Sequence, residues 1–251
     1  MLHLFYYRDL KRFKFTDIHL ACILSAHTNG KFQKIVLHED TPGDTSAYIE
    51  ARKLPYVEFR KTEFPTHING YRISDQKLSL DLIRLQTLIA EGGVVSDLDF
   101  IFLKDFSPIL EHEGFIGTQC KQKKKLSCAL MYSKEPQNPF FIEYLEAYKT
   151  WIPEHEKKFW TQVNTIPYEL SEKLPTIKIL PTKAFFPVAC SNKTFLQGHD
   201  IPISESYAVN LWCRLKPHLT LQDIDKTVIK SFLPELKPSI LLLEGVTLTF
   251  D

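Results

Sequence analysis

The sequence lacks an excess of charge of one sign, a long hydrophobic run and a paired-cysteine motif. Its 251 residues include 31 Lys and Arg against 30 Asp and Glu, which leaves a net charge of +1. This balance gives no general attraction to phosphate backbones, so we expect no nucleic-acid partner. No uninterrupted apolar stretch approaches the ~20 residues that cross a bilayer. We therefore expect no membrane-spanning segment, and only peripheral contact with a membrane stays open.

The five cysteines are odd in number, widely spaced and without a CxxC pair. This pattern is typical of reduced, buried thiols in an intracellular protein and argues against a disulfide framework or a zinc site. The opening MLHLFYYRDLKRFKF also lacks the charged-then-apolar order of a signal peptide. We therefore expect a cytoplasmic protein, with any membrane contact at the inner surface.

Several common catalytic signatures are also absent. The nine histidines form no HxxxH or HExxH spacing, no glycine-rich phosphate loop is present, and no Ser-His-Asp or Cys-His signature is recognisable. His199 and His218 remain alternative candidates for metal ligands because they flank the region of Asn210. The basic run at 121–125 is interpreted as a solvated loop, with attraction to acceptor phosphates or an anionic membrane as the alternative.

Strand-like and helix-like segments alternate from the start of the chain. Strands are predicted at LHLFYY, KIVLHE and YVEF, and helical segments at 17–27 and 46–53 lie between them. This order predicts an α/β fold, with a Rossmann-like, mostly parallel central sheet flanked by helices. The length suits one domain, and no linker divides it. The proline-rich stretch 151–186 predicts a more irregular C-terminal portion, with a surface helix at 219–232.

A long helix and a buried strand are predicted in the middle of the chain. The helix runs from Ser74 or Asp75 to Glu91, and its apolar stripe consists of Leu78, Leu82, Leu85 and Ile89. Gly92 ends this helix as a left-handed cap. The segment VVSDLDFIFL then predicts a strand buried on both faces. Strands at FIGTQ and LSCALMYS follow, and Asn138 and Pro139 open an amphipathic helix.

Two aspartates interrupt this apolar strand. Burying the charges of Asp97 and Asp99 costs several kcal/mol unless a partner compensates them. In an extended chain their side chains share one side, where a divalent cation relieves their repulsion and binds substrate phosphates. The alternative is that they cap a turn at the strand end. Asp223 and Asp225 repeat the spacing, but in a predicted helix they diverge, so we interpret them as a solvated face.

The segment KLSLDLIRLQTLIAEGGVVSDLDFIFLKDF, residues 77–106, closely resembles the DxD segment of the family 32 sugar-nucleotide glycosyltransferases. That family includes α-1,4-galactosyl-, mannosyl- and capsular-polysaccharide-type transferases. The resemblance implies a GT-A fold, a divalent metal, Mn²⁺ or Mg²⁺, and retaining transfer from a nucleoside diphosphate sugar. Similarity outside this segment is weaker and extends over most of the chain.

The resemblance assigns roles to four residues of this segment. Asp81 and Arg84 match helix positions that contact the ribose and the sugar or phosphate of the donor. The alternative for this pair is a surface salt bridge at i, i+3 spacing. Asp97 matches the aspartate that touches ribose and reaches the metal, and Asp99 matches the direct metal ligand.

Segments near the two ends also resemble the family. Tyr6, in HLFYY, falls where a tryptophan commonly stacks on the base, with core packing as the alternative. YAVNLW resembles the closing His-x-Trp element, which implies metal binding by Asn210 and donor binding by Trp212. LSCALMYSKEPQNPFFIEYL resembles the strand and helix of the sugar pocket, and NTIPYEL a later Thr-Gly-Pro turn.

Four residues depart from the family pattern. Val95 stands where tyrosine is usual, Cys128 where asparagine is frequent, Ile166 where glycine is and Asn210 where histidine is. Asparagine still offers a carbonyl oxygen to a hard cation. These departures motivate an alternative function, a catalytically inactive GT-A module that binds a sugar or a partner. A phosphatase of the Asp-x-Asp-x-Thr type is a third hypothesis, and Ile101 at the threonine position argues against it.

The sequence therefore predicts a metal-dependent retaining glycosyltransferase. It would move a hexose from UDP-hexose, such as UDP-galactose, or alternatively from GDP-mannose, to a glycan or lipid-linked saccharide. Residues 1–110 are expected to bind the nucleotide sugar, and residues 111–251 to form the sugar pocket and acceptor side. Asp97 and Asp99 are the predicted catalytic residues.

Overall fold

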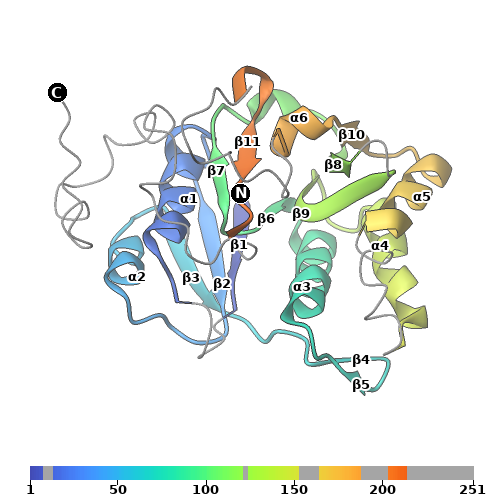
Figure 1. Ribbon diagram of the computed structural model, residues 1–251, viewed down its shortest axis with the longest axis horizontal. Coiled ribbons are helices and arrows are strands. Elements are labelled where there is room, and N and C mark those ends of the chain that lie inside the picture. Colours follow the sequence, from blue (N-terminus) through green and yellow to red (C-terminus); the bar gives the residue numbers. More distant parts are fainter. Residues whose placement is uncertain (8–13, 121–123, 153–163, 188–202, 214–251) are drawn as a thin grey trace.

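A computed structural model of the chain describes residues 1–7, 14–120, 124–152, 164–187 and 203–213. Its centre is a seven-stranded sheet in the order β10-β8-β9-β6-β1-β2-β3 (Figure 1). The strands of this sheet are β1 (Leu2–Tyr6), β2 (Ile35–Glu39), β3 (Val57–Lys61), β6 (Gly93–Ser96), β8 (Gly114–Cys120), β9 (Lys125–Ser133) and β10 (Lys178–Leu180). Within this described sheet only β9 runs antiparallel to its neighbours. The predicted mostly parallel sheet is therefore confirmed.

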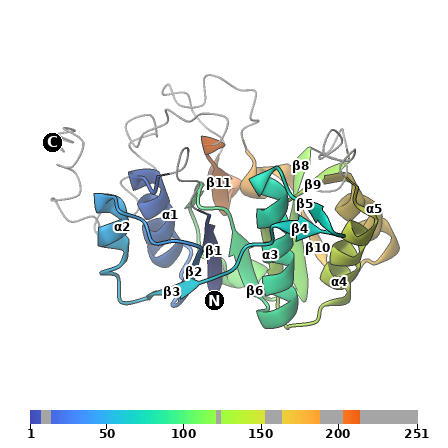
Figure 2. The same ribbon diagram turned by 90° about the horizontal axis from the view of Figure 1, so that it is seen from below.

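Helices cover both faces of the sheet (Figures 1 and 2). On one face lie α1 (Asp17–Thr28) and α2 (Ser46–Ala51), and on the other α3 (Gln76–Glu91), α4 (Pro139–Glu146) and α5 (Ile166–Lys173). Alternate residues of β1 serve the two layers, since Leu2 and Leu4 pack with the first and Phe5 with the second. A sheet buried on both faces explains why its strands read as continuous hydrophobic runs.

The helix α3 forms where the sequence predicts it, and Gly92 ends it, but with ψ of −154° rather than in the conformation of a left-handed cap. The Asp75 side chain accepts a hydrogen bond from the Lys77 N–H at 2.9 Å, which caps the first turn. Leu78, the first residue of the predicted stripe, is buried in the second hydrophobic layer. Gly92 follows with φ of +67°, and a Cβ there would lie 3.2 Å from the Ser133 carbonyl oxygen. This glycine therefore lets the chain reverse sharply and places β6 beside β1.

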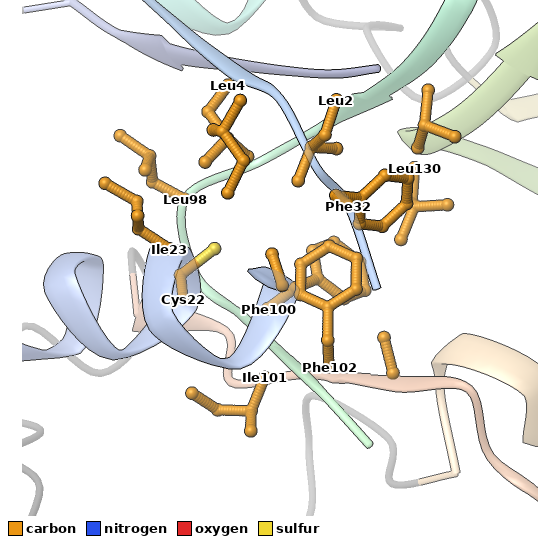
Figure 3. Packing of buried hydrophobic residues seen from close by; sticks show 14 of the residues in the cluster. Leu2, Leu4, Cys22, Ile23, Phe32, Leu98, Phe100, Ile101, Phe102 and Leu130 are labelled. Atoms are coloured by element: carbon orange, nitrogen blue, oxygen red, sulfur yellow. The ribbon is translucent and has the colours of Figure 1, made fainter. Parts of the chain in front are cut away.

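The sequence predicts one continuous strand at 94–103, but the structure has two separate strands there. The prediction is wrong on this point. β6 ends at Ser96, residues 97–99 form a turn, and β7 (Phe100–Phe102) leaves the main sheet to pair antiparallel with β11 (Ala208–Asn210). Leu98 points into the core between the two strands, close to Ile23 of α1 (Figure 3). The chain turns here because Leu98 is buried while its two charged neighbours stay partly exposed.

The remaining described elements are short. They are the hairpin of β4 (His67–Ile68) and β5 (Tyr71–Arg72), the helix α6 (Thr182–Phe185), and the 3₁₀ turns η1 (Ser107–Ile109), η2 (Ala147–Thr150) and η5 (Ile203–Glu205). Over the part of the chain that the structure describes, no helix is both long and apolar enough to cross a bilayer. Cys22 and Cys128 are buried free thiols. Cys190, His199, His218, the Asp223 and Asp225 pair and the helix predicted at 219–232 lie outside the described residues.

Two buried histidines link β1 to β2. His3 Nδ1 lies 3.0 Å from His38 Nε2, and His38 Nδ1 lies 3.0 Å from the Thr62 hydroxyl. Burial lowers the pKa of His3 to about 4 and that of His38 to about 3. Both imidazoles are therefore neutral in the folded protein at neutral pH.

We expect this pair to make the fold sensitive to acid. The unfolded chain takes up protons near pH 6.5 that the buried imidazoles do not, so stability falls as the pH drops from about 6.5 toward 4. Each histidine contributes a slope of up to about 1.4 kcal/mol per pH unit. In the variant His38→Gln, whose new side chain does not titrate, the free energy of unfolding should depend less steeply on pH. Urea unfolding measured across this pH range tests this. An unchanged slope in this variant would contradict the role assigned to His38.

Candidate functional site

The two aspartates of the DxD motif lie where parallel strands of the central sheet end. The turn that carries them follows β6, beside the carboxyl end of β1. In open α/β sheets, ligands bind outside the carboxyl ends of the strands. Asp97 and Asp99 are partly exposed while Leu98 between them is buried. The motif therefore presents both carboxylates at the edge of the sheet.

Arg84 connects the helix α3 to this turn. Its Nη1 donates to Asp81 Oδ1 at 2.8 Å, and its Nη2 donates to Asp97 Oδ1. The side chains of Asp81 and Arg84 are each only 4% exposed. The alternative of a surface salt bridge is therefore wrong, because the pair is buried and joined to the DxD motif.

Cys128 is part of the same cluster. Its Sγ on β9 donates to Asp81 Oδ1 at 3.0 Å, and it lies 3.8 Å from Arg84 Nη1. The sequence marks Cys128 only as a departure from the family pattern. Nothing local predicts its contact with Asp81, because the two residues are 47 positions apart.

Two polar atoms of this cluster have no hydrogen-bond partner among the described residues. They are Asp81 Oδ2 and Arg84 Nε, and both are buried. Buried polar groups are normally paired, so unpaired ones call for a specific explanation. An added polar ligand would supply the missing partners, which is consistent with the donor-binding role expected for these two residues.

Asp99 is held by the segment that follows β11. The Leu211 N–H donates to the Asp99 carbonyl at 2.8 Å. Asn210 Nδ2 donates to Asp99 Oδ1 at 3.2 Å, and the Cys213 N–H donates to Asp99 Oδ2 at 3.0 Å. The structure thus brings Asn210 to Asp99, 111 residues earlier in the chain. Its amide nitrogen, rather than its oxygen, faces the carboxylate.

The two aromatic residues expected at the donor lie in different surroundings. Tyr6 is only 4% exposed, and its ring packs edge-on against Phe15 with centroids 5.4 Å apart. This environment corresponds to the core-packing alternative. Trp212 is partly exposed, and its ring lies 5.6 Å from that of Phe186. Two further residues that depart from the family pattern are also placed by the structure. Val95 is fully buried in β6, and Ile166 is the first residue of α5.

The electrostatics of the cluster favour a cation. Burial, which Arg84 opposes, raises the pKa of Asp81 to about 7. Burial and then the charge of Asp97 raise the pKa of Asp99 to about 7. Burial alone would lower the pKa of Arg84, but Asp97 and Asp81 raise it. The Arg84 guanidinium pairs with Asp81 and Asp97, and no ion pair of Asp99 is found among the described residues, so the site has capacity for further positive charge.

The donor set is suited to a hard divalent cation that shares its ligands with a substrate. Asp97 and Asp99 supply carboxylate oxygens, which Mg²⁺ and Mn²⁺ prefer. No cluster of three or more His, Cys, Asp or Glu able to hold a metal is found among the described residues. A cation bound by one or two carboxylates is completed by water and substrate phosphates. The residues present fit such an ion.

Comparisons with known proteins agree with this arrangement. A model of the family described as glycosyltransferase sugar-binding region containing DXD motif matches residues 21–116. Glucan organizing enzyme 1 of Cryptococcus neoformans var. grubii is 24% identical over 174 residues, which cover 63% of this chain and 46% of that protein. The apo structure of the bifunctional glycosyltransferase WbbM superposes with a TM-score of 0.56 at 10% identity, over 99% of this chain and 51% of that one. The chain thus spans about half the length of each relative.

The matched segment contains both the DxD aspartates and the buried pair of α3. The likeness to WbbM, at this low identity, concerns the fold alone. Together these findings confirm the resemblance drawn from the sequence. Residues 21–116 thus match the model of a glycosyltransferase sugar-binding region containing a DXD motif, on a chain with the GT-A fold.

Proposed function

We propose that this protein transfers a hexose from a nucleoside diphosphate sugar to a glycan or glycoconjugate acceptor, in a reaction that needs Mn²⁺ or Mg²⁺. The favoured donor is a UDP-hexose such as UDP-galactose, with GDP-mannose as the alternative. The name of the fungal relative refers to glucan, which supports a glycan on the acceptor side. Residues 1–110 serve the donor, and residues 111–251 the sugar and the acceptor.

One observation carries this proposal. The Asp97 and Asp99 carboxylates lie together at the carboxyl edge of the sheet, and Arg84 faces the first of them. A diphosphate at this edge brings two negative charges, which need cations on both sides. The guanidinium offers one of these, and an ion on Asp99 offers the other.

The protein's own residues supply binding and orientation. Asp99 and Asp97 would hold the ion, which would supply positive charge beside the leaving diphosphate. Arg84 and Asp81 bind polar groups of the donor through their unpaired Nε and Oδ2 atoms. Trp212 packs near the donor, and the acceptor lies on the side of the second half of the chain.

We propose retention of the anomeric configuration, as the family resemblance implies. The acceptor hydroxyl attacks from the face that the diphosphate leaves, and a phosphate oxygen takes the proton. This route needs no nucleophile from the enzyme. It suits a chain in which no Ser-His-Asp or Cys-His signature is recognisable.

A second candidate is a catalytically inactive GT-A module that binds a sugar or a partner. The ion pair between Arg84 and Asp97 favours it, because one of the two DxD carboxylates is already engaged within the protein. The burial of Tyr6 also favours it, because that ring does not offer a face to a base. Binding of a nucleotide sugar without turnover would distinguish this module from the transferase.

Incubation of the protein with a panel of nucleotide sugars and Mn²⁺ tests the proposal. We expect slow, metal-dependent hydrolysis of one donor, detected as release of the nucleoside diphosphate. Addition of EDTA should abolish this release, since the cation offsets charge on the leaving group. Binding without any release would favour the inactive module. Phosphate release from simple monoesters would instead favour a phosphatase.

A further inference from the structure

The contact between Asn210 and Asp99 has a definite polarity. Asn210 Oδ1 accepts the Trp212 N–H at 2.8 Å, and its Nδ2 donates to Asp99 Oδ1. Rotating the amide by half a turn would place an NH₂ group against the Trp212 N–H, where neither group accepts. The Trp212 N–H therefore fixes the amide nitrogen toward Asp99. Asn210 itself is only 3% exposed.

The backbone of this segment is bent toward the same carboxylate. Trp212 has φ of +55°, a conformation that bulky residues rarely adopt. Such outliers persist only where surrounding contacts hold them, and they concentrate at functional sites. Here the unusual turn directs the Cys213 N–H to Asp99 Oδ2 at 3.0 Å. Both carboxylate oxygens of Asp99 are thus held by residues 210–213.

We propose that residues 210–213 form a clamp for Asp99, in which Asn210 is a positioning residue that orients the carboxylate through its amide nitrogen and is not a metal ligand. This inference rests on the proposed function only in that Asp99 serves the metal and the donor diphosphate. The clamp replaces the ligand role predicted for Asn210 from the sequence. It also explains why an amide side chain suits position 210, because an amide carries a hydrogen-bond donor and an acceptor together.

The variant Asn210→Asp separates the two roles. It keeps the acceptor for the Trp212 N–H, removes the donor to Asp99 and adds a negative charge beside it. The clamp predicts at least a tenfold loss of affinity for Mn²⁺ in the presence of UDP, measured by the electron paramagnetic resonance of free Mn²⁺. A ligand role predicts unchanged or tighter binding, because a carboxylate is a better ligand for a hard cation than an amide. Unchanged or tighter binding would therefore overturn the clamp.

A second measurement uses the metal-free protein. In EDTA, Asn210→Asp places two carboxylates against each other, and we expect the thermal midpoint to fall by about 5 °C. The double variant Asn210→Asp/Asp99→Asn exchanges donor and acceptor across the contact and should recover most of this loss. It should not recover Mn²⁺ binding, since the carboxylate at position 99 is gone. If the double variant does not recover the thermal midpoint, the clamp is overturned.

Asn138→Asp is the matched control. Asn138 also accepts a backbone N–H two residues on, from Phe140 at 3.0 Å, and donates through Nδ2, to the Glu113 carbonyl at 3.3 Å. It lies at the start of α4, so the same substitution should leave Mn²⁺ binding unchanged. If the wild-type protein itself binds no Mn²⁺ with either UDP or GDP, the proposed function fails. In that case the thermal midpoints of the single and double variants in EDTA still test the clamp.

Discussion

Replacing Asp99 by asparagine is expected to abolish Mn²⁺-dependent release of nucleoside diphosphate from the donor. The change removes a carboxylate that stabilises charge on the leaving group through the ion, so we expect a loss of about a thousandfold or more in turnover. The fold should persist, because Leu98 and the β7 residues that anchor this turn are unchanged. Donor hydrolysis assays, with circular dichroism on the same sample, measure both effects.

Asp105→Asn is the control for this change. Asp105 is an exposed aspartate six residues along the chain, whose side chain accepts the Ser107 N–H at 2.8 Å. It takes no part in the described cluster, so turnover should equal that of the wild type. Full activity in Asp99→Asn, or an equal loss in Asp105→Asn, would refute the role given to Asp99.

Replacing Arg84 by methionine is expected to have the largest effect on stability. The substitution keeps much of the side-chain volume but leaves the buried Asp81 and the Asp97 carboxylate without their cation. Removing one partner of a buried ion pair typically costs about 3–5 kcal/mol. For a chain of this size, that corresponds to a fall of about 10 °C in the thermal midpoint. Differential scanning calorimetry of the metal-free protein measures this shift.

Arg60→Met provides the comparison at the surface. Arg60 is about one-third exposed and pairs with Glu58 at 3.0 Å and with Glu91 at 2.6 Å. Exposed ion pairs contribute up to ~1 kcal/mol, so a much smaller shift is expected. Equal shifts in the two variants would show that the burial of Arg84 has no special energetic weight.

Much of the first half of the fold could be predicted because its signals are local. The helix α3 is set by its apolar stripe, by the cap at Asp75 and by the stop at Gly92, all within one stretch of chain. The alternation of strands and helices from Leu2 to Lys61 likewise needs no distant information. Local patterns of this kind place elements correctly even where the tertiary contacts are unknown.

The break at the DxD motif was less predictable. A strand buried on both faces shows no alternation, so nothing marks the residue at which it leaves the sheet. The structure ends β6 at Ser96 because Leu98 turns into the core beside α1. The spacing of the aspartates predicted that the two side chains share one side of an extended strand. In the structure the two residues lie on a turn between β6 and β7.

The contacts that complete the site depend on distant parts of the chain. Cys128 meets Asp81 across 47 positions, and Asn210 meets Asp99 across 111. Likewise, whether Tyr6 faces a ligand or the core depends on Phe15 and Tyr48, whose rings pack against it. Sequence spacing carries no information on such pairings. The family resemblance identified the positions, but only the fold supplies the polarity of their hydrogen bonds.

In the proposed function, the Asp97 and Asp99 pair binds a cation and, through it, the diphosphate of an activated sugar. A crystal structure of the protein with Mn²⁺ and UDP tests this most directly. We expect the ion on the Asp99 carboxylate and next to the diphosphate, with Arg84 close to the nucleotide. An ion and nucleotide bound elsewhere, with the Asp99 carboxylate free of metal, would contradict the proposed function.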